Sequence, residues 1–178
     1  MTLAEYVNER LYRTKKVFIF NDINEPLIKQ AIEIILSFPK GTKEIEVWIR
    51  SNGGMVEDGF ALVDVMMSRD YIVKTIGVGY VSSMAVLLLA AGTKGHRYIA
   101  PNTSSMVHQI MWGSHGAIDE MAMRQAQSKK LQEKYVAVLG QVTNRTVKQW
   151  DKILTPNETW LTAEEVVKLG IADEIKVL

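Results

Sequence analysis

Residues 72–92, IVKTIGVGYVSSMAVLLLAAG, carry the clearest signal of the fold in this sequence. Ile72 to Val78 is rich in β-branched residues, which predicts a strand. Gly79 to Ser83 breaks that pattern, and an apolar stretch then runs to Gly92, which is typical of a buried helix. The apolar run from Met84 to Ala91 is far shorter than the ~20 residues that a membrane-spanning helix needs. The stretch therefore predicts a strand, a turn and a helix inside a globular domain.

The same order of strand, turn and helix occurs twice upstream, after a short amphipathic segment at 3–12. An apolar strand at 17–20 precedes a helix that Asn24 and Pro26 open. An alternating strand at 45–49 leads into Ser51-Asn52-Gly53-Gly54 and a further helix. Strands and helices that alternate in this way form a mostly parallel sheet with crossover helices. The fold class is therefore α/β.

Downstream, the pattern predicts further strands and two helices. One helix is unusually long, running from Ala117 to about Gln141, and such a helix often projects and packs on a neighbouring subunit. A capping box of Thr162 and Glu165 begins the last helix, and Gly170 ends it. The predicted strands of this half are 96–100, 104–109 and 159–161.

Length and composition fit a single globular domain over residues 1–178. The hydrophobic fraction is 47% and the charged fraction 23%, which excludes disordered and low-complexity classes. There is no Ser/Gly-rich linker and no internal repeat to mark a boundary. The first residues carry an early acid and no apolar core, so we expect no secretory signal and a soluble, cytoplasmic protein.

Charge and residue types narrow the chemistry. With 21 basic and 20 acidic residues, the net charge is +1, so we expect neither nucleic acid nor a membrane as partner. The chain has no cysteine and three histidines, which leaves no thiol nucleophile or thiolate metal site and makes a multi-histidine metal centre unexpected. Serine, carboxylate, lysine and single histidine side chains remain as catalytic groups.

Three features are compatible with acyl transfer, and each has a plainer interpretation. The paired glycines Gly53 and Gly54 can present backbone N–H groups to an oxyanion, or they simply turn the chain. Ser83 begins the buried helix, where the helix dipole favours an alkoxide, although Ser82 or Ser83 there can equally be an N-cap. The sequence is not the G-x-S-x-G nucleophile motif, because residue 81 is valine.

His108 is the third feature. It stands near the end of an apolar strand, where a neutral imidazole can act as a general base, or can be a hydrogen-bonded structural residue. His96 and His115 have no serine placed comparably, and we expect both to be solvated.

These motifs together resemble ClpP, the proteolytic subunit of the ATP-dependent Clp protease. Ser-x-Gly-Gly follows a strand, and Gly-x-x-x-Ser-Met then precedes Leu-Leu-Leu-Ala-Ala-Gly. The resemblance covers roughly residues 17–176, and Ser83 and His108 are 25 residues apart as in the family. Its other motifs are Ala100-Pro101-Asn102-Thr103, Met106-Val107-His108-Gln109, Trp160-Leu161-Thr162-Ala163-Glu164-Glu165 and Gly170-Ile171-Ala172-Asp173.

The resemblance assigns roles to single residues. It implies that Ser83 is the nucleophile, that His108 is the general base, and that the N–H groups of Gly54 and Met84 form the oxyanion hole. The family's triad aspartate falls on Glu158, and a glutamate can also accept the imidazole N–H. It implies no cofactor and no metal.

The resemblance also implies a fold and an assembly. The fold is a ClpP/crotonase-like spiral of βαβ units, with a short N-terminal segment at 1–16 and a projecting handle helix at about 117–141. The assembly is a heptameric ring, commonly stacked into a tetradecamer, that cleaves polypeptides inside a chamber. A Clp-type AAA+ ATPase is an implied partner, although Glu46 and Ser68 replace aromatic residues where the family docks it.

Two alternative functions remain. A crotonase-type acyl-CoA enzyme has the same fold and the paired-amide oxyanion hole, but it does not need the Ser83–His108 pair. A non-catalytic or weakly active ring subunit is the second alternative: the retained Ser83 and His108 argue against it, and Glu158 in place of the family's aspartate keeps it open.

Overall fold

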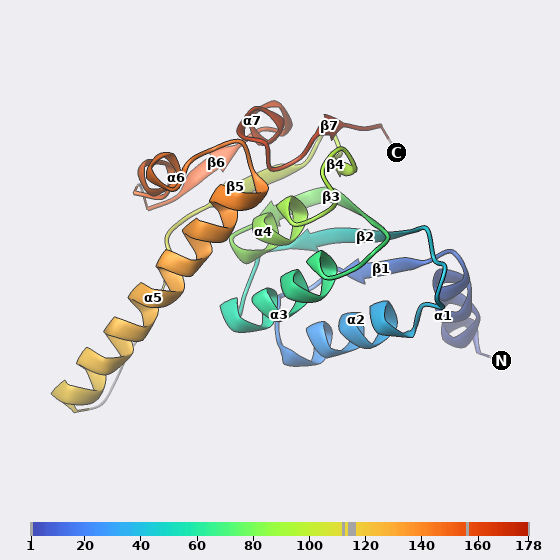
Figure 1. The fold of residues 1–178 in the computed structure, drawn as a ribbon, viewed down its shortest axis with the longest axis horizontal. Helices are drawn as coiled ribbons and strands as arrows, with labels where there is room; N and C mark the ends of the chain where they lie inside the picture. Colours follow the sequence, from blue (N-terminus) through green and yellow to red (C-terminus); the bar gives the residue numbers. More distant parts are fainter. Residues whose placement is uncertain (1, 112, 114–116, 156, 178) are drawn as a thin grey trace.

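The computed structural model describes residues 2–111, 113, 117–155 and 157–177 (Figure 1). Its described part contains a seven-stranded sheet, in which every pairing is parallel except that of β5 with β6. The path β1-β2-β3-β4-β7 consists of Lys16–Ile19, Glu44–Ser51, Ile72–Ser82, Arg97–Ile99 and Glu174–Ile175. β5 (Ser104–Val107) pairs with the end of β3, and β6 (Thr159–Leu161) pairs with β5. The predicted α/β class with a mostly parallel sheet is confirmed.

Helices cover the sheet, and one helix, α5, projects away from it. Figure 1 shows α2 and α3 side by side along β1 and β2, with α4 beside them and α5 pointing away from the body. None of the helices in the described ranges is long and apolar enough to cross a bilayer. The helices are α1 (Leu3–Arg13), α2 (Glu25–Ser37), α3 (Val56–Met67), α4 (Met84–Ala90), α5 (Ile118–Val142), α6 (Val147–Leu154) and α7 (Ala163–Leu169).

The predicted helix ends are confirmed by their caps. The Asn24 side chain accepts the Leu27 N–H at 3.1 Å at the start of α2, as its N-cap role requires. Thr162 and Glu165 form both bonds of the capping box of α7. Gly170 ends α7 with a φ of 76°, a left-handed conformation that glycine adopts without steric cost.

α4 is the centre of the core. All seven of its side chains, from Met84 to Ala90, are at most 1% exposed, because the helix packs among β2, β3, α3 and α5. Because every side chain of α4 is apolar and buried, the helix needs no amphipathic stripe. The position of its first residue is thereby fixed from all sides.

Two expectations about strand ends were wrong, and two elements were missed. β3 does not end at Val78 but continues to Ser82, because Gly79 takes a φ of 69° and the strand exchanges β4 for β5 as its neighbour. β5 ends at Val107, so His108 follows the strand and is not part of it. α6 and β7 were not predicted at all.

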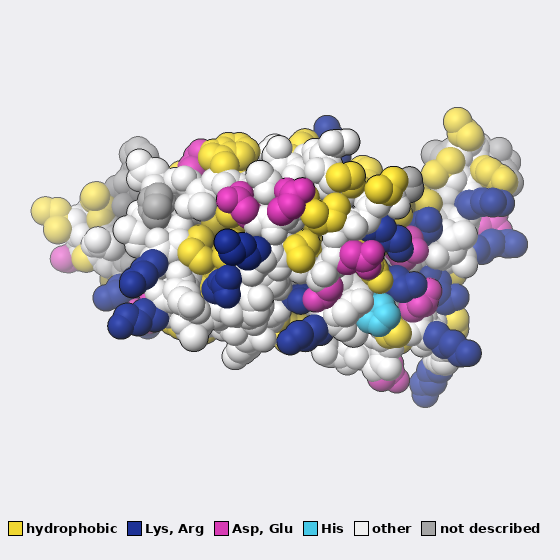
Figure 2. Space-filling model, turned by 90° about the horizontal axis from the view of Figure 1, so that it is seen from above, with side chains coloured by type: hydrophobic (Ala, Val, Ile, Leu, Met, Phe, Trp, Pro, Cys, Tyr) yellow, Lys and Arg dark blue, Asp and Glu magenta, His cyan; other side chains and the backbone are white. Residues whose placement is uncertain are grey.

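The long helix was predicted within a residue at each end, but only its second half is packed. Leu131, Tyr135 and Leu139 are buried, whereas Ile118 is 86% and Met123 67% exposed. Figure 2 shows yellow apolar side chains at the far left end of the molecule, where α5 begins in Figure 1. On the face shown, charges of both signs are interspersed.

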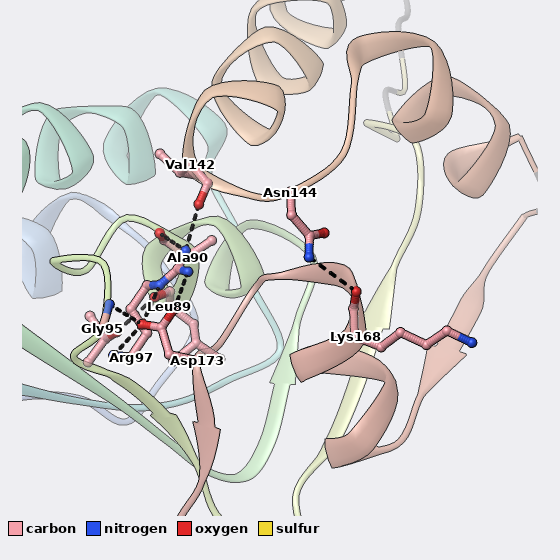
Figure 3. A network of polar contacts seen from close by, with 9 residues as sticks. Leu89, Ala90, Gly95, Arg97, Val142, Asn144, Lys168 and Asp173 are labelled. Carbon is pink, nitrogen blue, oxygen red and sulfur yellow. Dashed lines mark hydrogen bonds and ion pairs between the residues drawn. The ribbon is translucent and has the colours of Figure 1, made fainter.

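A buried arginine connects the ends of α4 and α5 to the sheet (Figure 3). The guanidinium of Arg97 donates to the carbonyl of Ala90 at 3.1 Å and to that of Val142 at 2.6 Å. Its Nε donates to the Asp173 carboxylate at 2.9 Å, and that carboxylate also accepts the Gly95 N–H at 2.7 Å. Arg97 therefore fixes the C-terminal ends of both helices that approach the site described below.

Asp173→Asn is expected to destabilise the fold by about 3 kcal/mol. The side chain of Arg97 is 3% exposed, so the substitution would leave a buried cation without its anion. For a chain of this length, this corresponds to a melting temperature lower by roughly 6–12 °C, measured at a fixed protein concentration. Glu174→Gln is the matched control, because it removes one negative charge from the exposed neighbouring residue. Equal melting temperatures for the two variants would contradict this prediction.

The Arg97–Asp173 pair predicts that the stability of the fold depends on pH. Burial alone would raise the pKa of Asp173, but hydrogen bonds from Arg97 and Gly95 outweigh it and hold that pKa below its ordinary value. The stabilisation is therefore complete above about pH 4 and is lost as the pH falls through the lowered pKa. We expect the difference in melting temperature between the wild type and Asp173→Asn to narrow only in acid.

Candidate active site

The ends of two parallel strands bring the predicted nucleophile and base to the same edge of the sheet. β3 pairs with β5 in a register that sets Ser82 beside Met106. Ser83 directly follows β3, and His108 directly follows β5. Because both strands run in the same direction, both residues lie at their carboxyl ends, the edge where open α/β sheets bind ligands.

Ser83 and His108 are in hydrogen-bond contact. The distance from Ser83 Oγ to His108 Nε2 is 2.9 Å, and His108 is 8% exposed. A neutral imidazole that carries its proton on Nδ1 would accept the serine proton at Nε2. The pair has the geometry that proton removal from a serine nucleophile requires.

The backbone of Ser83 is strained. Its φ is 55° and its ψ −126°, and among the described residues only Lys15 shares a positive φ without being glycine. The Ser83 side chain makes no capping hydrogen bond to α4, so the plainer N-cap interpretation of Ser83 is wrong. The hydroxyl points to His108 instead. Strain at a residue with this contact is typical of a functional site.

The turn at Ser51–Gly54 requires glycine at position 53. A Cβ atom at Gly53, whose φ is 96°, would lie 2.6 Å from the Ser83 Cβ and 2.8 Å from the Ser82 carbonyl oxygen. No side chain fits at that distance. The turn after β2 therefore packs its backbone directly against the strained turn at Ser83.

The two amides expected to bind an oxyanion lie beside Ser83. Gly53 O and Met55 N–H both bond to Ile23, so the Gly54 N–H between them points the other way, and it bonds to none of the described residues. The Met84 N–H is the first of α4 and has no acceptor within the helix. Both residues line the same hollow as Ser83.

That hollow has a volume of about 200 Å³. Ser83 and His108 line it together with apolar side chains. Its lining residues are Asn52, Gly54, Val56, Ser83, Met84, His108, Ile110, Met111 and Tyr135. A larger hollow of about 600 Å³ lies between α1, β1 and α2, but its lining contains no histidine, so we assign the chemistry to the smaller one.

Glu158 lies near His108 but bonds elsewhere. β6 runs antiparallel to β5 with Thr159 beside Val107, and this register, continued by one residue, sets Glu158 opposite His108. Its carboxylate accepts the indole N–H of Trp160 at 3.1 Å. Within the described ranges, no hydrogen bond or ion pair joins Glu158 to His108. The structure thus brings the two backbones together and leaves the carboxylate turned to Trp160.

The other histidines do not belong to the site. The expectation that His96 is solvated was wrong in part, because its Nδ1 atom is buried and bonds to none of the described residues. His115 lies outside the described residues. No cluster of three metal-ligating side chains occurs in the described part of the chain.

Two residues of α5 reach the site and were missed by the sequence analysis. The Tyr135 hydroxyl donates to the Ser83 carbonyl at 3.2 Å, and the Gln132 side chain accepts the Ile110 N–H at 2.8 Å. The sequence predicted Tyr135 only as part of the apolar stripe of the long helix. A hydroxyl within an otherwise apolar stripe is the one signal that could have found it.

Comparisons with known proteins agree with the geometry. A family model described as Clp protease matches residues 3–177. The ATP-dependent Clp protease proteolytic subunit 2 of Thermobifida fusca (strain YX) is 30% identical over 175 residues, which cover 97% of this chain and 86% of that protein. Subunit 1 of the same protease from Corynebacterium jeikeium (strain K411) is 30% identical over 171 residues, or 95% and 90%.

Proposed function

This chain belongs to the Clp protease family and is a ClpP-type serine endopeptidase, and on that premise we propose that Ser83, His108 and Glu158 form its catalytic triad. The observation that carries the proposal is the 2.9 Å contact between Ser83 Oγ and His108 Nε2. The proposed substrate is an unfolded polypeptide or a peptide, which the enzyme cuts to short products.

In the first step, His108 Nε2 takes the proton of Ser83 Oγ as the oxygen attacks a peptide carbonyl carbon. The carbonyl oxygen becomes an oxyanion, and the N–H groups of Gly54 and Met84 donate to it. The tetrahedral intermediate then collapses and the C–N bond breaks. His108 gives its proton to the leaving amine, and the acyl group stays on Ser83.

In the second step, a water molecule attacks the acyl-enzyme while His108 takes one of its protons. The same two amides bind the second oxyanion. The bond between Ser83 Oγ and the acyl carbon breaks, and the proton on His108 returns to Ser83. Glu158, once turned to Nδ1 of His108, accepts that N–H and stabilises the imidazolium in both steps.

Reaction with a serine-directed fluorophosphonate separates this function from its two alternatives. A peptidase becomes labelled and loses hydrolysis of fluorogenic peptides in proportion to the label. A ring subunit without proteolysis hydrolyses no peptide before or after treatment. A crotonase-type enzyme turns over an acyl-CoA, does not cleave the peptides and does not need the Ser83 hydroxyl. Either of these last two results would overturn the proposed function.

We further propose the assembly and location that the family implies. Members of the Clp protease family form oligomeric rings with Clp ATPases, and for this chain we propose a heptameric ring that stacks into a tetradecamer in the cytoplasm. The exposed apolar side chains in the first half of α5, Ile118 and Met123 among them, support a contact between rings through this helix. Particles of seven or fourteen times the 20.1 kDa chain mass are the expected result in solution.

A Clp-type AAA+ ATPase from an unrelated bacterium is expected to stimulate this enzyme poorly or not at all. Docking of such a partner depends on a few buried apolar anchors. Glu46 stands at one of the two positions where the family docks its ATPase. Its carboxylate accepts the Trp48 indole N–H at 2.9 Å and lies 3.3 Å from the Lys16 ammonium. At the second docking position, the Ser68 hydroxyl donates to the Val65 carbonyl and accepts from Arg69. Both positions are polar and already paired.

The measurement is the rate of protein degradation with and without the ATPase. A related proteolytic subunit that the same ATPase does activate is the positive control. Glu46→Phe is expected to increase stimulation, because it restores an aromatic surface. Strong stimulation of the unaltered protein would contradict the prediction.

A further inference from the structure

The strained conformation of Ser83 depends on contacts that hold its backbone. A positive φ costs free energy in any residue with a Cβ, so it persists only where the surroundings fix it. Two of these contacts come from the backbone alone. The Ser83 N–H donates to the Met106 carbonyl at 2.7 Å, and the Ser83 carbonyl accepts the Val86 N–H at 3.0 Å.

The third contact is the only hydrogen bond that a side chain of the described residues makes with this backbone. The Tyr135 hydroxyl donates to the same Ser83 carbonyl at 3.2 Å. It comes from α5, 52 residues further along the chain. The backbone contacts would form with many sequences, whereas this one exists only because residue 135 carries a hydroxyl.

The carbonyl that Tyr135 holds belongs to the same peptide unit as the Met84 N–H. A trans peptide is planar, so its C=O and N–H groups point in opposite directions and cannot rotate independently. A hydrogen bond that fixes the Ser83 carbonyl therefore fixes the direction of the Met84 N–H. That N–H is one of the two donors that would bind the oxyanion.

We propose that Tyr135 is a positioning residue for peptide hydrolysis, whose hydroxyl holds the Ser83–Met84 peptide so that the Met84 N–H meets the oxyanion. The inference rests on the proposed function, because it takes Ser83 as the nucleophile and Met84 as an oxyanion donor. Tyr135 does not itself touch the reacting atoms in this role.

The surroundings of Tyr135 suit a permanent donor. The residue is 3% exposed and packs in the core among Leu131, Val136 and Leu139 of its own helix. Burial raises its pKa, so the hydroxyl keeps its proton throughout the range in which the enzyme can act. Packing alone would need only the ring.

A second side chain of α5 supports the same arrangement. Gln132 lies one turn before Tyr135, on the same side of the helix. Its Oε1 atom accepts the N–H of Ile110, two residues after His108, at 2.8 Å. Adjacent side chains of one helix therefore hold the segment of the nucleophile and the segment of the base.

The test is the Tyr135→Phe variant, which keeps the ring and removes the hydroxyl. We expect kcat for a fluorogenic peptide to fall about 3- to 10-fold with little change in KM, as for the loss of one neutral hydrogen bond. A peptide boronate, which forms a tetrahedral adduct with the serine, is expected to lose affinity by the same factor. A product peptide, which forms no adduct, is expected to bind unchanged.

Tyr71→Phe is the matched control. Its hydroxyl also donates to a backbone carbonyl at 3.2 Å, that of Ile35, but far from the site. We expect its kcat and boronate affinity to equal those of the wild type. Ser83→Ala is run beside both variants, since full activity in that variant would overturn the proposed function itself.

Two results would overturn the inference while leaving the proposed function intact. The first is an inactive Ser83→Ala variant beside a Tyr135→Phe variant with wild-type kcat and boronate affinity, whatever its melting temperature. The hydroxyl would then serve stability alone. The second is an equal loss of affinity for the boronate and the product peptide, which would show that the hydroxyl shapes the pocket and not the oxyanion donor.

Discussion

Ser83→Ala is expected to lower the rate of peptide hydrolysis by about 10⁴-fold or more. The Ser83 Oγ atom is the proposed attacking atom, and no other hydroxyl is in contact with His108 among the described residues. The fold and the assembly are expected to survive, because the lost hydroxyl makes a single hydrogen bond and alanine adopts the strained backbone at the same cost as serine. Turnover of a fluorogenic peptide and the particle mass are the two measurements.

Ser82→Ala is the matched control for that variant. Ser82 precedes Ser83 and is 4% exposed, so the substitution makes the same chemical change one residue away. We expect near wild-type turnover. Retained activity in Ser83→Ala together with its loss in Ser82→Ala would place the nucleophile one residue upstream.

Glu158→Gln is expected to lower the rate by about 10²- to 10⁴-fold while the assembly stays intact. A carboxylate opposite His108 would fix the imidazole tautomer and stabilise the imidazolium, and an amide can do neither as well. Glu158 is the only carboxylate between Asp151 and Glu164. For the interaction to form, its carboxylate must leave the Trp160 indole and turn to Nδ1 of His108.

Glu158→Asp is the matched variant, and it is expected to retain activity. It keeps the charge and removes one methylene, which gives the aspartate that the resemblance to ClpP implies at this position. Near wild-type turnover in Glu158→Gln would contradict the role of Glu158. The enzyme would then work with a Ser83–His108 dyad whose imidazole is oriented by another group.

Much of the fold follows from local signals in the sequence. Asn24 with Pro26 and the Thr162–Glu165 box define helix starts through bonds within four residues, so a local pattern is enough to find them. The fully apolar run at 84–91 predicts burial without any knowledge of its neighbours. The order of strands and helices then predicts a parallel sheet.

The elements that were missed depend on distant partners. β7 has two residues, and its existence follows from pairing with β4, which no local pattern reveals. β3 continues past Gly79 because β5 supplies new bonds where β4 ends. α6 is different, since the capping box of Thr146 and Gln149 was present in the sequence and was overlooked.

The candidate site shows the same division. The pairing of Ser83 with His108 was reached through the resemblance to ClpP, and the registers of β3, β5 and β6 give it a physical basis. A hydroxyl within an apolar stripe singles out Tyr135. Its hydrogen bond to the Ser83 carbonyl and the strained φ of Ser83 could not be predicted, because both depend on contacts between segments that only the folded chain brings together. The orientation of the Glu158 carboxylate depends on Trp160 in the same way.

Complete reaction of the assembled protein with a fluorophosphonate would show which residue is the nucleophile. Tandem mass spectrometry of the digested protein then identifies the modified residue. We expect one phosphonyl group per chain, on Ser83, and no labelling when His108 is replaced by alanine. A label on Ser82 or on any other residue, or an unlabelled Ser83 in a protein that still cleaves peptides, would contradict it.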